Sequence, residues 1–213
     1  MNRINQDLIE QMADELTPVR SMKLRDGLAL VALALLATVL LVALFEGLWS
    51  GILTGEASAF FMVTNGLLLV LGLASASSVL TMASPRVGGR HDGPKWAAAM
   101  VAVLPLAALL MLAARGGLAE ILADPHGIAC FTIALGASSL TAIALLFWLR
   151  RGAPVSLNSA GLHLGIAAGA FGSVAAGLAC PIDTMAHLAI YHVAPVAAAG
   201  LIGRLLVPRL LRW

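Results

Sequence analysis

The sequence predicts an all-α integral membrane protein with six transmembrane helices, a short cytoplasmic N-terminal amphipathic helix and both termini in the cytoplasm. Of the 213 residues, 60% are hydrophobic and only 11% are charged, whereas a soluble domain carries about 25% charged residues. The charged residues are also segregated, so that long stretches contain none. These stretches have the length of about 20 residues that a helix needs to cross a bilayer.

Two parts of the chain differ in composition. Residues 1–26 are polar and acidic and form the predicted cytoplasmic segment, and residues 27–213 form the predicted transmembrane domain. The apolar stretches must cross as helices, because backbone with unpaired polar groups cannot face lipid. We expect the spans at about 27–48, 59–82, 96–114, 127–149, 160–180 and 185–207.

Residues 4–17 have the pattern of an amphipathic helix, which Pro18 is expected to end. Its apolar stripe consists of Ile4, Leu8, Met12 and Leu16, with Ile9 beside it. Its other faces carry the carboxylates of Asp7, Glu10, Asp14 and Glu15. A helix of this length has no core of its own, so its stripe could enter the groove of a protein partner. The acidic faces argue against a helix lying on anionic lipid, which attracts basic faces.

The distribution of basic residues predicts the orientation. Of the 13 Lys and Arg residues, only Arg115 lies in the loops after the first, third and fifth spans. The others are Arg3, Arg20, Lys23, Arg25, Arg86, Arg90, Lys95, Arg150, Arg151, Arg204, Arg209 and Arg212. The positive-inside rule therefore places both termini and the loops after the second and fourth spans in the cytoplasm. The tryptophans fit an aromatic belt, with Trp49 near the outer face and Trp96, Trp148 and Trp213 near the inner face.

The only two cysteines are expected to lie together at the outer face. Cys130 lies three residues into the fourth span and Cys180 closes the fifth, and the short inner loop 150–159 joins these antiparallel spans. Helices joined in this way usually pack together. A thiol pair in an oxidising compartment can form a disulfide, and it could equally bind a soft metal ion. Residues that could complete a coordination shell are His126, Asp183 and His187.

The spacing of the cysteines does not by itself indicate a functional pair, because they form no C-x-x-C pattern. They could instead be two unrelated residues that pack as small apolar side chains. We expect His192, inside the sixth span, to form hydrogen bonds between helices rather than to bind a metal. Gly161, Gly165 and Gly169 repeat every four positions, which favours close helix packing over the alternative of a ligand cleft along this stripe. Pro195 predicts a kink in the sixth span.

Several stretches resemble the NrsF-type membrane anti-sigma factors. They are DLIEQMADELTPVR at 7–20, RRGAP at 150–154, AGLHLGIAAGAFG at 160–172, ACPIDTMAHLAIYH at 179–192 and LLRW at 210–213. The first three spans match mainly in hydropathy. Residues 186–192 depart from the Trp-Tyr pair that the resemblance leads us to expect in the sixth span.

The resemblance implies a multi-pass regulator of the bacterial inner membrane that keeps an extracytoplasmic-function sigma factor from RNA polymerase. It implies that Cys130 and Cys180 are sensor thiols for heavy-metal or oxidative stress, and that residues 4–20 belong to the sigma-binding region. No cofactor is required, although a soft metal ion could bind transiently at the two cysteines. The expected partners are the sigma factor and the lipid bilayer, with no direct contact to nucleic acid and no enzymatic activity.

Two other classes of function fit the sequence less well. A transporter for a small solute or metal would use the fourth to sixth spans, and it would need an acidic or polar path across the bilayer. We find no such path in the sequence. An enzyme acting on thiols or lipids would need a base near the cysteines, and only His126 and His187 could serve.

Overall fold

The computed structural model describes residues 3–15, 22–85, 93–114 and 124–211. Within these ranges the chain forms helices and no strands. Six helical segments are long and apolar enough to cross a membrane, as predicted. They are α2 (Leu24–Phe45), α4 (Ala59–Met82), α5 (Gly93–Ala114), α7 (Gly127–Arg150), α8 (Leu157–Ala179), and α9 (Met185–Tyr191) together with α10 (Ala194–Leu210).

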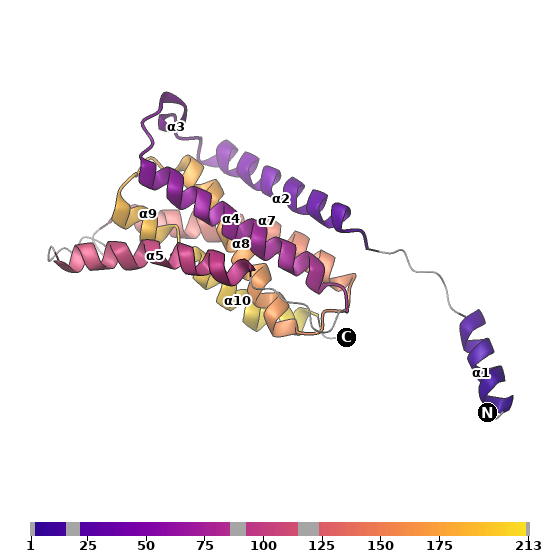
Figure 1. Cartoon of the computed structure of the whole chain (residues 1–213). Coiled ribbons are helices and arrows are strands. Elements are labelled where there is room, and N and C mark those ends of the chain that lie inside the picture. Colours follow the sequence, from indigo (N-terminus) through magenta and orange to yellow (C-terminus); the bar gives the residue numbers. More distant parts are fainter. Residues whose placement is uncertain (1–2, 16–21, 86–92, 115–123, 212–213) are drawn as a thin grey trace.

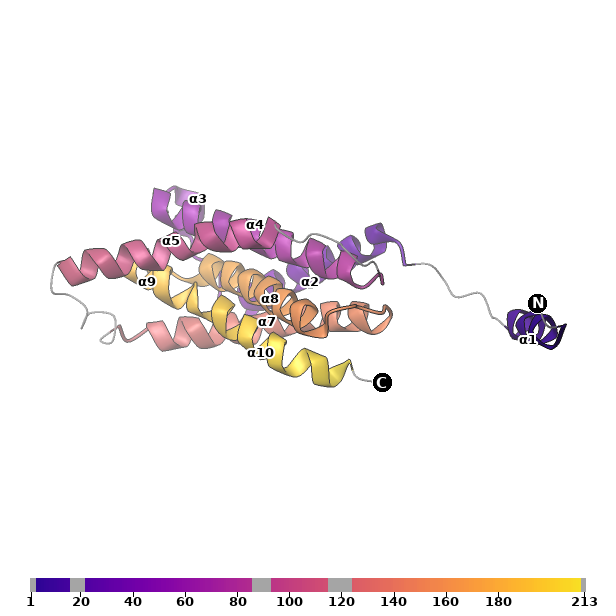
Figure 2. The ribbon, with the colours of Figure 1, turned by 60° about the horizontal axis from the view of Figure 1, so that its bottom comes forward.

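The six segments form one bundle in which successive segments run in opposite directions (Figures 1 and 2). Segments α2, α5 and α8 run toward the end that carries the short helix α3 (Gly51–Thr54) and α9. Segments α4, α7 and α10 return toward the end where the chain terminates. The start of α7 and the end of α8 therefore lie together, at the end opposite the C-terminus.

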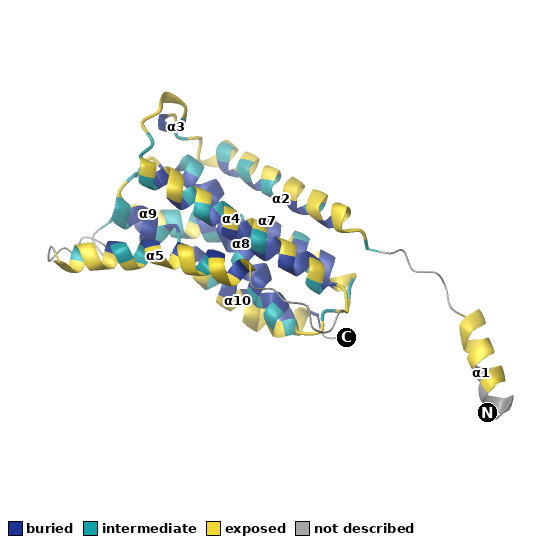
Figure 3. Ribbon diagram, in the orientation of Figure 1, coloured by how far each residue is buried: buried dark blue, intermediate teal, exposed yellow. Residues whose placement is uncertain are grey.

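The outer surface of the bundle is apolar. Large hydrophobic side chains remain exposed along its helices (Figure 3), among them Leu33, Leu44, Met100, Leu110, Ile143 and Leu205. Soluble monomers rarely expose contiguous apolar surface beyond a few hundred Å², whereas lipid tails solvate such a surface readily. The length of the helices and this surface together indicate a multi-pass membrane protein.

Helix α8 is the most deeply buried of the six segments. Its glycine stripe allows the backbone of α10 to approach closely. A methyl group added at Gly161 would collide with the carbonyl oxygen of Gly203, and one added at Gly165 would collide with that of Ala199. The close packing that the repeat predicted is confirmed.

Replacing Gly165 with Leu is expected to lower the stability of the bundle by about 1–3 kcal/mol, the usual cost of overpacking, because a backbone carbonyl cannot move aside as a flexible side chain can. The measurement is the thermal unfolding midpoint of the purified protein in detergent. Gly136→Leu on α7 is the matched control, because a Cβ at Gly136 meets no atom within 4 Å. An equal loss of stability in both variants would contradict the packing role of the stripe.

The sixth span differs from the prediction because it is broken rather than kinked. Helix α9 ends at Tyr191 and α10 begins at Ala194, with Pro195 at the start of α10. Proline has no N–H to donate and its ring collides with the carbonyl four residues earlier, which either kinks or interrupts a helix.

Other boundaries also shift by a few residues. Helix α2 begins at Leu24, before the predicted residue 27, and ends at Phe45. Helix α8 begins at Leu157 rather than at 160, because the side chain of Ser156 accepts a hydrogen bond from the N–H of Ser159 and caps the helix. The side chain of Trp148 is buried near the end of α7, and its indole N–H donates to the carbonyl of Leu80 at 3.3 Å.

The N-terminal helix α1 (Arg3–Asp14) stands apart from the bundle in both views (Figures 1 and 2). The side chains of Ile9 and Met12 are each 61% exposed, and those of Asp7, Glu10, Asp14 and Glu15 are exposed as well. Of Leu8, only its place in the helix is described. Leu16, Pro18, Arg20, Arg86, Arg90, Arg115, Arg212 and Trp213 lie outside the described residues.

Candidate functional site

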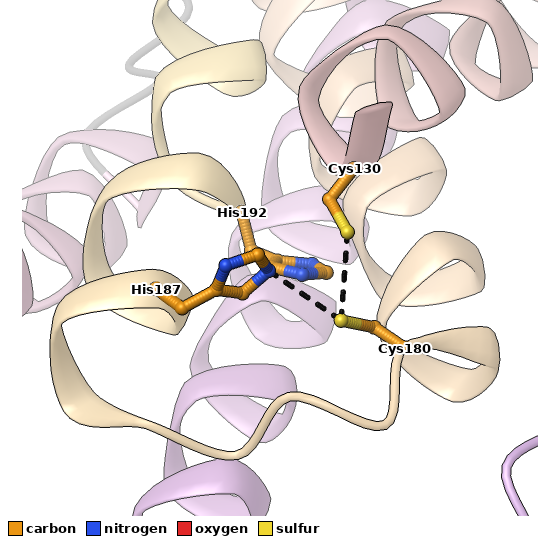
Figure 4. A group of neighbouring side chains, drawn as sticks. All are labelled: Cys130, Cys180, His187 and His192. Carbon is orange, nitrogen blue, oxygen red and sulfur yellow. Dashed lines mark hydrogen bonds between the residues drawn. The ribbon is translucent and has the colours of Figure 1, made fainter. Parts of the chain in front are cut away.

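Two cysteines and two histidines gather at the end of the bundle opposite the C-terminus (Figure 4). Cys130 lies near the start of α7 and Cys180 directly follows α8, and their sulfur atoms are 3.5 Å apart. The proximity of the two thiols, predicted from the antiparallel spans, is confirmed. Both cysteines are free, and Cys180 is buried.

His187 connects Cys180 to a carboxylate. Its Nε2 lies 3.4 Å from the sulfur of Cys180, and its Nδ1 lies 2.6 Å from Oδ2 of Asp124. Because an ionised carboxylate can only accept, Nδ1–H donates to Asp124 and Nε2 is left as the acceptor for the thiol. Burial acts to raise the pKa of Asp124, but hydrogen bonds from His187 and from the backbone N–H of His126 outweigh it and hold that pKa below its usual value.

His192 is the fourth member of the cluster. It is buried at the junction between α9 and α10, and its Nδ1 lies 3.5 Å from the carbonyl oxygen of Ser173 on α8. Its Nε2 has no hydrogen-bond partner among the described residues. One ligand atom from each of Cys130, Cys180, His187 and His192 lies within 4.8 Å of all the others.

The segment between α8 and α9 is anchored by the side chains of Asp183 and Thr184, just before α9 begins. The carboxylate of Asp183 accepts hydrogen bonds from the N–H and the hydroxyl of Ser58, at 2.5 and 2.7 Å, where α4 begins. The hydroxyl of Thr184 caps α9 by accepting from the backbone N–H of His187 at 3.4 Å. These caps hold Cys180 and His187 side by side.

The structure brings three of the five residues considered as metal ligands into the cluster: Cys130, Cys180 and His187. Asp183 lies outside it and uses its carboxylate to cap α4. His126 is exposed and lines a cavity of about 260 Å³ together with Glu46 and the two cysteines. This cavity therefore lies directly beside the two cysteines.

The expected hydrogen bond of His192 between helices is confirmed by its contact with the Ser173 carbonyl on α8. The sequence did not, however, indicate that His192 and Asp124 lie beside the cysteines. Residues five apart on a continuous helix point about 140° away from each other, so His187 and His192 did not suggest one site. The break before Pro195 changes that geometry. The sequence did contain one signal for His192. An ionisable residue inside an apolar span is by default a candidate functional residue.

The cluster can support three kinds of chemistry. The imidazole of His187, held by Asp124, can accept the proton of the Cys180 thiol and leave a thiolate. Two thiols at this distance can be oxidised to a disulfide. Two sulfur and two imidazole donors can also bind a soft or borderline metal ion. The order carboxylate, imidazole, thiol resembles a catalytic triad, but the Cys180 sulfur is buried against Cys130.

The fold and the site define a multi-pass helical membrane protein with a thiol–imidazole cluster at one end of its bundle. Residues 12–213 match the family NrsF, described as negative regulator of sigma F. The chain belongs to this family, whose members are regulators rather than enzymes and whose description implies a sigma factor as partner. No curated protein and no solved structure matches the chain significantly.

Proposed function

We propose that the chain is a membrane anti-sigma factor that sequesters an extracytoplasmic-function sigma factor through α1. It releases the sigma factor when Cys130 and Cys180 react with a heavy metal or an oxidant. The observation that carries the proposal is a pair of free thiols 3.5 Å apart in a member of a family of negative sigma-factor regulators.

The exposed helix α1 supports the binding role. Ile9 and Met12 are more than half exposed although they are apolar, and a partner groove would remove them from water. The surrounding carboxylates of Asp7, Glu10 and Asp14 are exposed and could meet basic residues of the sigma factor. Such complementary charge favours rapid and specific association.

The orientation follows from the distribution of Lys and Arg, which favours a cytoplasmic location for both termini in a bacterial inner membrane. A sigma factor works in the cytoplasm, and α1 is then on its side of the membrane. The thiol cluster lies at the opposite end of the bundle. This orientation would place it toward the outer compartment, where disulfides persist.

The signal starts with a change in the distance between α7 and α8. With hydrogen peroxide as the oxidant, the two thiols lose two protons and two electrons, a sulfur–sulfur bond forms, and the peroxide becomes two water molecules. The sulfurs then lie about 2.05 Å apart. Because α8 packs tightly on α10 through Gly161 and Gly165, a displacement of α8 carries α10 with it. Release requires that the two arrangements of the bundle bind the sigma factor with different affinity.

The test is co-purification of the full chain from native membranes under reducing conditions. We expect a sigma factor to be retained, to be unable to direct transcription by RNA polymerase while bound, and to dissociate when cadmium or peroxide is added. A purified chain that retains no sigma factor, or that leaves transcription unchanged, would refute the anti-sigma role. Retention that cadmium and peroxide do not alter would refute the sensor role alone.

A further inference from the structure

We infer that Cys130, Cys180, His187 and His192 form a tetrahedral binding site for a single Zn²⁺ or Cd²⁺ ion, in which Asp124 positions His187. The regulatory meaning of this site rests on the proposed function, whereas the binding itself does not. His126 and Asp183, which the sequence suggested as ligands, are not part of it.

The distances between the donor atoms fit one ion. Around a tetrahedral centre with Zn–S bonds of about 2.3 Å and Zn–N bonds of about 2.0 Å, two sulfurs lie about 3.8 Å apart and a sulfur and a nitrogen about 3.5 Å apart. The sulfurs of Cys130 and Cys180 are 3.5 Å apart, and Nε2 of His187 is 3.4 Å from the Cys180 sulfur. These three ligand atoms therefore need only small movements to surround an ion, and the nitrogen donor of His192 lies within 4.8 Å of each of them.

Hydrogen-bond partners at Nδ1 favour the tautomer in which each imidazole can present Nε2 to a metal ion. Asp124 holds the proton of His187 on Nδ1, so the lone pair on Nε2 points toward the sulfur of Cys180. A carboxylate that accepts from the second nitrogen of a metal-bound histidine is the usual outer partner of such a ligand. The carbonyl of Ser173 faces Nδ1 of His192 and favours the same tautomer there.

The Nε2 of His192 is the observation that points most directly to a ligand. The residue is only 1% exposed, and this nitrogen has no hydrogen-bond partner among the described residues. A buried polar atom without a partner is unfavourable and calls for an explanation such as a bound ion. A metal ion at the centre of the cluster would satisfy it.

The chemistry of the donors selects the ion. The four ligand atoms are sulfur and nitrogen, which suit zinc and cadmium, whereas magnesium and calcium require oxygen ligands. Binding of a divalent ion by two thiolates and two neutral imidazoles releases two thiol protons and leaves a centre with no net charge. A neutral centre is compatible with burial, and the cavity beside Glu46 and His126 provides its entrance.

An ion at this site would join three separate parts of the bundle. It would connect the start of α7 with the segment after α8 and with both ends of α9. His192 lies where α9 meets α10, so a bound ion would also fix the angle between these helices. A metal and a disulfide exclude each other because both need the same two sulfur atoms.

The test uses the reduced, full-length protein in detergent, without the sigma factor, and two probe ions. Titration with Cd²⁺ should give one ion per chain and a cadmium–thiolate charge-transfer band. Co²⁺ should give the visible spectrum of a tetrahedral centre with two thiolates. The His192→Asn and His187→Ala variants should bind Cd²⁺ more than about 100-fold more weakly, and Asp124→Asn about 10-fold to 100-fold more weakly.

His126→Ala is the matched control and should bind within twofold of the wild-type affinity, because His126 lies outside the four donors. Elution as a single species with an unchanged unfolding midpoint shows that His192→Asn is folded, and Cys130→Ser provides a second variant that lacks a ligand. Absence of binding by the folded wild type, or equal affinities of His192→Asn and His126→Ala, would overturn the site. The proposed anti-sigma function fails separately, when metal binds as expected but no sigma factor is retained.

Discussion

Substitution of Ile9 and Met12 together by Asp is expected to abolish retention of the sigma factor, with a loss of affinity of more than about 100-fold. Both side chains are 61% exposed on a helix that stands apart from the bundle, so the substitutions leave the membrane domain unchanged. In a bound complex each Asp would place a carboxylate in an apolar groove without a partner, which costs several kcal/mol. The measurement is the dissociation constant of the purified sigma factor for the full chain in lipid nanodiscs.

The matched control is Gln6→Asp, which adds one negative charge to α1 outside the apolar stripe. Gln6 is exposed, and its replacement keeps the helix without placing a charge in the groove. We expect less than a threefold change in affinity. If the double variant binds as tightly as the wild type, the sigma factor is held by the inner loops or by α10 instead of α1.

The fold could be predicted largely from composition, because lipid leaves helices as the only spanning structures for such a chain. The number of spans, the alternation of their directions and the packing of the glycine stripe follow from the residues themselves. The break at Tyr191–Ala194 was missed because Pro195 permits both a kink and a complete interruption. Which of the two forms depends on packing against neighbouring helices, which a single sequence does not specify.

The cluster could be predicted only in part for a related reason. Topology places Cys130 and Cys180 at one end of the bundle, because that inference needs only two antiparallel helices. The positions of histidines around them depend on the shape of the segment that follows α8. Asp183 appeared to be a ligand because it lies between Cys180 and His187, but its carboxylate caps α4 through Ser58, 125 residues away in the chain.

Replacement of either cysteine by Ser is expected to abolish release of the sigma factor by cadmium and by peroxide, while retention under reducing conditions persists. A disulfide and a two-thiolate metal site each need both sulfur atoms, so Cys130→Ser, Cys180→Ser and the double variant should all lose the response to the same extent. The measurement is the fraction of sigma factor released from nanodiscs at increasing concentrations of each stimulus. Ala179→Ser is the matched control, because it adds a hydroxyl beside the same cavity and keeps both thiols.

In a variant that keeps both thiols, the responses to peroxide and to cadmium should differ. His192→Asn removes a nitrogen donor from the cluster but leaves the sulfur atoms of Cys130 and Cys180 within reach of each other. We expect this variant to release the sigma factor on peroxide treatment and to require more than about 100-fold more cadmium than the wild type, the loss expected on removal of a metal ligand. Equal sensitivity to cadmium in wild type and His192→Asn would mean that the thiols bind the metal without the imidazole. A response that persists in Cys130→Ser would mean that the signal is received elsewhere in the chain.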